Sequence, residues 1–150
     1  MLYDEVLTLY NRSRLMHYRT LFGHIHEKDG SLSATEAFAA DVIYLLGEPS
    51  IKEFSDHLGI SQPTATYKVN SLISKGYIEK LPPRGDRRET RIRVCNKYFD
   101  YSGEQDEFIR RAVEALESSC SPEELAAFEK TLSKLSLAVE AENRKDTVKE

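Results

Sequence analysis

Apolar residues recur at the spacing of an α-helix along most of the chain, and this pattern predicts a mostly helical protein. One such stretch runs from Leu2 to Ile25, and another fills the second half of Tyr98–Ser118. Three further segments open with serine followed three residues later by glutamate, the spacing of a capping box. They begin at Ser33–Glu36, Ser50–Glu53 and Ser121–Glu124. We therefore expect helices to start at these three serines.

The last of these segments carries a seam of apolar residues spaced three and four apart, which is typical of coiled coils. The seam consists of Leu125, Phe128, Leu132, Leu135 and Val139. A chain of 150 residues with so many one-sided helices cannot bury every apolar face alone. The pattern therefore predicts a homodimer, and we expect the charged tail after Asn143 to fray.

The centre of the chain predicts two helices joined by a very short turn. Gly59 suits the end of the helix that starts at Ser50, and Ser61 suits the start of the next one. This arrangement is a helix-turn-helix. The second helix, Ser61–Lys75, has apolar residues on one face and short hydroxyl and amide side chains on the other. Such side chains can approach the edges of nucleic-acid bases and both donate and accept hydrogen bonds.

After Gly76 the pattern changes to alternation. Residues 77–81 are a short strand candidate, and in residues 90–95 Thr90, Ile92 and Val94 alternate with Arg91, Arg93 and Cys95, which predicts a second strand. Between them lies the turn-rich, basic segment Pro82–Arg88. A β-ribbon with arginines at its tip, directly after a helix-turn-helix, is a wing. The expected fold class is therefore mostly α with a small β-wing.

Charge is distributed unevenly, and this changes the interpretation of an otherwise acidic chain. The net charge is −4, yet residues 61–97 contain nine basic and three acidic side chains, a balance of +6. The remainder then carries −10. A basic centre within an acidic chain is typical of a module that meets a polyanion. The chain has two cysteines, no apolar run of 18 residues and no basic leader before an apolar core. We expect a cytoplasmic protein that does not enter the membrane.

The order of these elements, from a long first helix through the wing to two final helices, resembles the MarR family of bacterial transcription regulators over nearly the whole chain. The most specific stretches are Ser61–Thr66 through Ile78, and Asp86-Arg87-Arg88 followed by Ile92 and Val94. The resemblance implies one domain over 1–150, with a winged-helix lobe at about 33–97 and dimerisation helices at about 1–28 and 99–143. It also implies a sequence-specific regulator of double-stranded DNA, acting as a repressor on a pseudo-palindromic operator.

The residues expected to contact DNA lie on the exposed face of the second helix and on the wing. The helix at 61–75 would lie in the major groove, and the resemblance implies that Arg88 reaches the minor groove while Asp86 braces the wing arginines. The full set of expected contacts is Ser61, Gln62, Pro63, Thr64, Thr66, Tyr67, Lys68, Asn70, Ser71, Arg84, Arg87, Arg88 and Arg91.

Several alternatives remain at this stage. No phosphate-binding glycine loop, nucleophile motif or dinucleotide fingerprint occurs, so we expect neither an enzyme nor a bound cofactor. A winged-helix adaptor that binds proteins would leave the polar helix face and the basic tip unused. His17 and His24 are seven residues apart and lack the spacing of a zinc site, so we expect no metal. A redox response would use Cys95 or Cys120.

Aromatic residues of the first two helices suggest a place for an effector. Members of the resembled family often have a ligand cleft beside the DNA-binding lobe. Tyr18, Phe22, Phe38 and Tyr44 could line such a cleft and bind a small apolar ligand that releases DNA.

Overall fold

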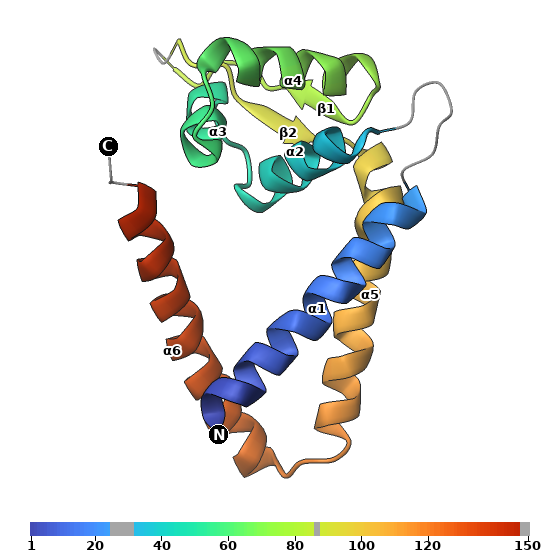
Figure 1. The fold of residues 1–150 in the computed structure, drawn as a ribbon, viewed down its shortest axis with the longest axis vertical. Helices are drawn as coiled ribbons and strands as arrows, with labels where there is room; N and C mark the ends of the chain where they lie inside the picture. The colour runs from blue at the N-terminus through green and yellow to red at the C-terminus, as the bar shows by residue number, and fades with distance from the viewer. Residues whose placement is uncertain (25–31, 86–87, 148–150) are drawn as a thin grey trace. The chain divides into compact units, whose positions relative to one another are not determined.

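The computed structural model describes residues 1–24, 32–85 and 88–147. The chain divides into two compact units, Met1–Gln105 and Asp106–Glu150. The elements, in chain order, are α1 (Leu2–His24), α2 (Ala34–Leu45), α3 (Ile51–Leu58), α4 (Gln62–Ser74), β1 (Ile78–Lys80), β2 (Ile92–Val94), α5 (Asn96–Glu117) and α6 (Pro122–Thr147) (Figure 1). The expected fold class, mostly helical with one small two-stranded sheet, is confirmed.

The predicted helix starts are confirmed by their hydrogen bonds. Ser33 and Ser50 each accept a bond from the backbone N–H of a glutamate three residues on, and that glutamate accepts one from the serine N–H. Ser121 and Glu124 make the same two bonds at the start of α6. These reciprocal bonds satisfy N–H groups that a helix start otherwise leaves without partners.

Two helix boundaries differ from the sequence-based prediction. Helix α5 begins at Asn96, directly after β2, rather than in the second half of 98–118. Its first turn is fixed by Tyr98, whose side chain is 1% exposed in the core. Helix α6 continues to Thr147, past the expected end at Asn143. Ion pairs between Glu140 and Arg144 and between Glu142 and Lys145 support this extra turn.

The core of the first unit lies where α2, α3, α4 and the sheet meet. Phe54 of α3, Ile43 of α2 and Leu72 of α4 are fully buried there, and Ile78 and Ile92 close it from the two strands. Helix α1 contributes Leu21, which is 2% exposed. This packing fixes α4 by its inner face and leaves its outer face to solvent.

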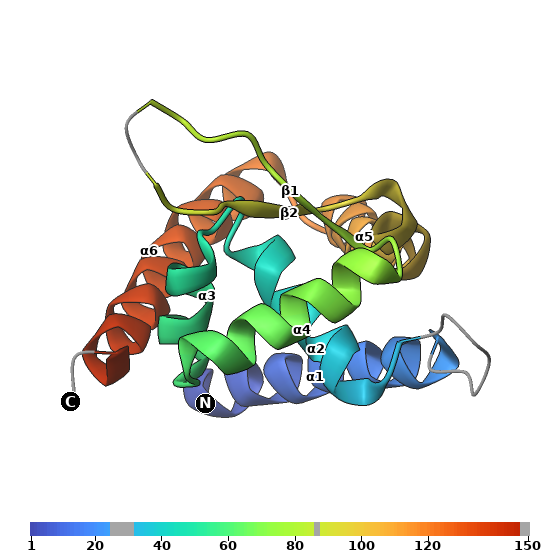
Figure 2. The same ribbon diagram turned by 90° about the horizontal axis from the view of Figure 1, so that it is seen from above.

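The wing is a two-stranded antiparallel ribbon that is extended by a third segment. Strands β1 and β2 lie side by side and antiparallel (Figure 2). Their register places Glu79 opposite Arg93. On the other edge of β2, the Ile51 N–H donates to the Thr90 carbonyl (3.0 Å), and the Ile92 N–H donates to the Pro49 carbonyl (2.9 Å). The loop between α2 and α3 therefore supports the wing at its base.

The second unit contains the last part of α5 and all of α6. The apolar seam of α6 is exposed over most of its length, with Phe128 at 49%, Leu132 at 45% and Val139 at 53%. Within the part of the chain that the structure describes, no helix is long and apolar enough to cross a lipid bilayer.

Candidate nucleic-acid interface

The helix-turn-helix is formed by α3 and α4 and a turn of three residues. Gly59 ends α3 in the left-handed conformation, with φ of 62°, which glycine adopts without a Cβ penalty. Ser61 then caps α4, and Pro63 lies in the first turn. Ala65 and Val69 on the inner face of α4 are fully buried. The short turn and this buried face hold α4 in one orientation against α3.

The outer face of α4 presents most of the residues expected to contact DNA. Tyr67 is the most prominent of these, with 78% of its surface exposed. Thr66 and Lys68 are partly buried at the flanks, whereas the remaining outer positions Gln62, Pro63, Thr64 and Asn70 are exposed. Ser61 also has a local structural role, because its hydroxyl caps the helix and bonds the Thr64 hydroxyl at 2.7 Å.

The carboxyl end of α4 is tied to the start of α2 by Glu36. One Glu36 carboxylate oxygen accepts a hydrogen bond from the Ser71 hydroxyl (2.6 Å), and the other accepts from the Lys75 ammonium (2.7 Å) and the Ser33 N–H (2.8 Å). Burial alone would raise the pKa of Glu36, but these bonds and the charge of Lys75 outweigh it and hold the pKa at about 2. Ser71, expected at the DNA face, is half-buried and donates its hydroxyl hydrogen to Glu36 of α2.

A second side chain reaches the same end of α4 from α5. The Lys97 ammonium donates to the Lys75 carbonyl at 2.8 Å and lies 4.5 Å from the centre of the Tyr77 ring. A cation at a helix carboxyl end interacts favourably with the carbonyls exposed there. The end of α4 is therefore held by Gly76, in the left-handed conformation with φ of 82°, and by two long-range contacts, from α2 and from α5.

The base of the wing is held by Glu48, in the loop before α3. Arg91 donates twice to this residue, from Nε to its backbone carbonyl (3.1 Å) and from Nη2 to its carboxylate (3.1 Å). Arg84 reaches the same carboxylate oxygen at 3.5 Å, and Arg93 lies 3.9 Å from the other one. Arg93 also pairs with Glu79 across the strands at 2.5 Å. Sequence reasoning did not find Glu48, because its partners are 36 to 45 residues further along the chain.

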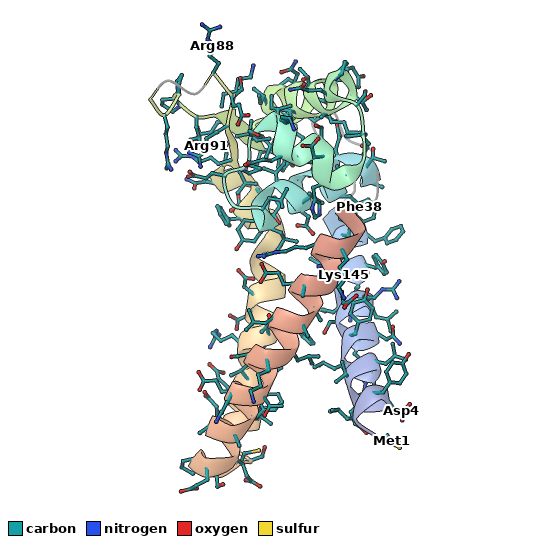
Figure 3. The ribbon with its side chains drawn as sticks, turned by 90° about the vertical axis from the view of Figure 1, so that its left-hand side faces the viewer. Met1, Asp4, Phe38, Arg88, Arg91 and Lys145 are labelled. Atoms are coloured by element: carbon teal, nitrogen blue, oxygen red, sulfur yellow. The ribbon has the colours of Figure 1, made fainter. Side chains whose placement is uncertain are left out.

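Arg88 differs from the arginines at the base of the wing. It is exposed and projects from the outer end of the wing, away from the helices, whereas Arg91 lies at the wing base (Figure 3). Among the described residues, no ion pair involves Arg88, Lys68 or Lys80. Asp86, expected to brace the wing, and Arg87, expected to contact DNA, lie outside the described residues.

Cysteine and histidine residues are the candidates for redox and metal chemistry. Burial, together with the charge of Glu79, raises the pKa of the Cys95 thiol, although Arg93 opposes this; a reactive thiolate needs the opposite shift. Within residues 1–24, 32–85 and 88–147, no three histidine, cysteine or acidic side chains gather into a metal site. The His17 ring nitrogen Nε2 lies 3.5 Å from an Asp41 carboxylate oxygen. The side chain of His24 is not among those described.

The aromatic residues expected to line an effector cleft are all partly exposed. Tyr44 lies in a ring cluster, 5.2 Å from Tyr98 and 5.7 Å from Phe99 between ring centres. Tyr18 lies beside the His17 ring, and Phe22 and Phe38 are 75% and 43% exposed.

Together, the short α3–α4 turn, the exposed polar face of α4 and the ribbon after it make a winged helix-turn-helix. Residues 25–89 match the model of the MarR family. The transcriptional regulator MntR of Salmonella typhimurium is 31% identical over 100 residues, which cover 59% of this chain and 64% of that protein. The winged helix-turn-helix of this chain is therefore similar to that of the MarR family. The chain spans less than two thirds of the length of these curated relatives.

Solved structures agree with this fold. Streptococcus pneumoniae FabT, solved in complex with DNA, is 24% identical, with 93% of this chain and 96% of FabT covered at a TM-score of 0.58. A MarR family protein from Bacillus stearothermophilus is 19% identical, with 92% of each chain covered at a TM-score of 0.62.

Proposed function

We propose that the protein is a cytoplasmic transcription regulator, acting as a repressor, that binds a pseudo-palindromic DNA duplex as a homodimer. The observation that carries this proposal is the outer face of α4. It presents Thr64, Tyr67 and Asn70 on a helix whose inner face is fully buried and whose carboxyl end is tied to α2 and α5. A rigid helix with a polar outer face suits the major groove. The relatives named as transcriptional regulators and the FabT complex with DNA support the same proposal.

The dimer is supported by the exposed seam of α6. Phe128, Leu132 and Val139 expose about half of their surface, and a row of large apolar side chains at coiled-coil spacing gains free energy when a second helix covers it. Sedimentation equilibrium at micromolar concentration should give twice the mass of the chain. Leu132→Glu should shift the equilibrium towards monomer, whereas Lys130→Glu, on the opposite side of α6, should not. A folded wild-type monomer would contradict the dimer.

DNA recognition is tested by selecting bound sequences from a random duplex pool. A two-fold dimer presents two α4 helices, so the enriched sequence should be a pseudo-palindrome with half-sites about 10 base pairs apart. Binding should weaken steeply with salt, because the basic side chains displace counterions from phosphates. If no symmetric motif is enriched, the result contradicts the proposed readout and favours a winged-helix adaptor that binds another protein.

Mutations should distinguish contacts of α4 with base edges from the contact of the wing with the minor groove or the DNA backbone. Tyr67→Ala or Asn70→Ala should lose about 1–3 kcal/mol at particular base pairs if these side chains contact base edges. Arg88→Ala should weaken binding to most sequences, with any selectivity limited to A·T-rich flanks. Measuring each variant against a panel of single-base operator changes separates the two patterns. Equal losses on every duplex for all three variants would remove α4 from base readout.

Release by a small apolar ligand is the regulatory part of the proposal. The exposed rings of Phe22 and Phe38 support it, because apolar aromatic side chains left in water are candidates for covering by a ligand. Such a ligand must favour a dimer whose α4 helices cannot both reach DNA. Phenolic and acyl compounds should then weaken DNA binding. If peroxide releases wild type but not a Cys95→Ser, Cys120→Ser double variant, oxidation is the trigger instead.

A further inference from the structure

We propose that Glu48 gives the wing arginines two different roles: Arg91 is a positioning residue that holds the wing, and Arg84 is a DNA contact that moves from Glu48 to a phosphate. This inference rests on the proposed function, which assigns DNA as the ligand but treats both arginines alike.

Arg91 is held by two bonds to one residue. Its guanidinium donates to the Glu48 carbonyl and to the Glu48 carboxylate, both at 3.1 Å, and its side chain is only 24% exposed. The backbone beside it is paired as well, because Ser50 and Arg91 form a β-bridge. Arg91 would have to break both side-chain bonds to reach DNA. Its geometry therefore suits alignment of the wing with the loop before α3.

Arg84 is held far more weakly by the same carboxylate. It makes one hydrogen bond of 3.5 Å to Glu48, and its side chain is 74% exposed. An exposed ion pair of this kind contributes little to stability. A DNA phosphate offers a charge-assisted bond at least as strong. Moving Arg84 from Glu48 to a phosphate therefore costs little free energy. Moving Arg91 would cost more, because two hydrogen bonds to Glu48 must break.

The carboxylate is not left unpaired when Arg84 departs. Arg91 keeps its bond to one oxygen, and Arg93 lies 3.9 Å from the other. Glu48 can therefore release one arginine without exposing a buried charge that lacks a partner. In the DNA-free protein the same carboxylate reduces the positive charge near the wing and keeps Arg84 from adventitious anions.

The experiment compares Arg84→Met and Arg91→Met on one duplex without an operator, measuring affinity from low to moderate salt. Each phosphate contact contributes about 0.9 to the slope of log K against log salt. Arg84→Met should reduce the slope by about 0.9 per wing. Arg91→Met should leave the slope unchanged while affinity falls. Lys130→Met, on the exposed side of α6, controls for the loss of one positive charge.

A second measurement, without DNA, tests the positioning role directly. Amide hydrogen exchange at Ile51 and Ile92, whose N–H groups bond the Thr90 and Pro49 carbonyls, should accelerate at least tenfold in Arg91→Met and remain unchanged in Arg84→Met. The proposal is overturned if the two variants change the salt slope equally, or if exchange is unchanged in Arg91→Met. If wild type binds no DNA, the proposed function fails, and the exchange data still decide the role of Arg91.

Discussion

Replacing Glu36 by glutamine should destabilise the protein at neutral pH and much less in acid. The carboxylate joins Ser71 and Lys75 of the α4 end to the cap of α2, and its pKa is lowered from 4.5 to about 2. One unit of pKa corresponds to about 1.4 kcal/mol, so the ionised form favours the folded state by about 3 kcal/mol. Glutamine keeps one oxygen acceptor, so we expect a loss of about 2 kcal/mol at pH 7.

The sign of the pH dependence follows from the direction of the pKa. Because the pKa is lower in the folded state, the stabilisation is complete above about pH 5 and disappears as the pH falls towards 2. Urea unfolding of wild type and Glu36→Gln, at one protein concentration, should give a difference in free energy of unfolding. This difference should shrink by about 2 kcal/mol between pH 7 and pH 3. A difference that stays constant over this range would refute the assignment to the Glu36 carboxylate.

Glu53→Gln is the matched control for this experiment. Glu53 occupies the same capping-box position in α3 and accepts a bond from the Ser50 N–H at 2.7 Å. No salt bridge among the described residues involves it. Glu53→Gln should therefore lose less stability at pH 7 than Glu36→Gln, because it removes a cap without a lysine partner. An equal loss would mean that the Glu36–Lys75 pair adds nothing beyond the cap.

Two further outcomes follow from local geometry. Gly59→Ala should lower the free energy of unfolding by about 1 kcal/mol in a urea titration, because an alanine at φ of 62° is strained. The cost is conformational, since no atom lies within 4 Å of the added Cβ. An unchanged midpoint would contradict this prediction. Alkylation of Cys95 by iodoacetamide, followed by peptide mass spectrometry, should reach half of its maximal rate at a higher pH than alkylation of a small cysteine peptide measured alongside, since burial raises the pKa of the Cys95 thiol. A half-maximal rate at the same pH as the peptide, or at a lower pH, would contradict that shift.

The helix starts were predictable because the interactions that define them are local. A capping box is complete within four residues, and the three serine–glutamate pairs form the bonds that their spacing indicates. The same holds for Gly59, whose left-handed conformation follows from its place after an apolar helix. In these segments the residues that contact one another are close in sequence, so their spacing alone is enough to predict the contact.

The contacts that fix α4 and the wing could not be predicted in this way. Ser71 was assigned to the DNA face by helical spacing, but its hydroxyl donates to Glu36, 35 residues away. Glu48 stands 43 residues before Arg91 in the sequence, in a loop with no pattern of its own. Only the packing of α2 against α4 and β2 brings these groups together. The sequence pattern therefore located the elements of the candidate interface, but not the side chains that orient them.

Residues 49–51 bond the edge of the wing at β2. The loop between α2 and α3 should therefore tolerate changes in length less well than the loop between β1 and β2. The strand pairs lie at Ile78–Lys80 and Ile92–Val94, so residues added near Pro83 leave that register as it is. An insertion between Gly47 and Ser50 would instead move the Pro49 carbonyl away from the Ile92 N–H and Glu48 away from Arg91. Related chains should therefore vary in length at the wing tip and keep a constant length between α2 and α3.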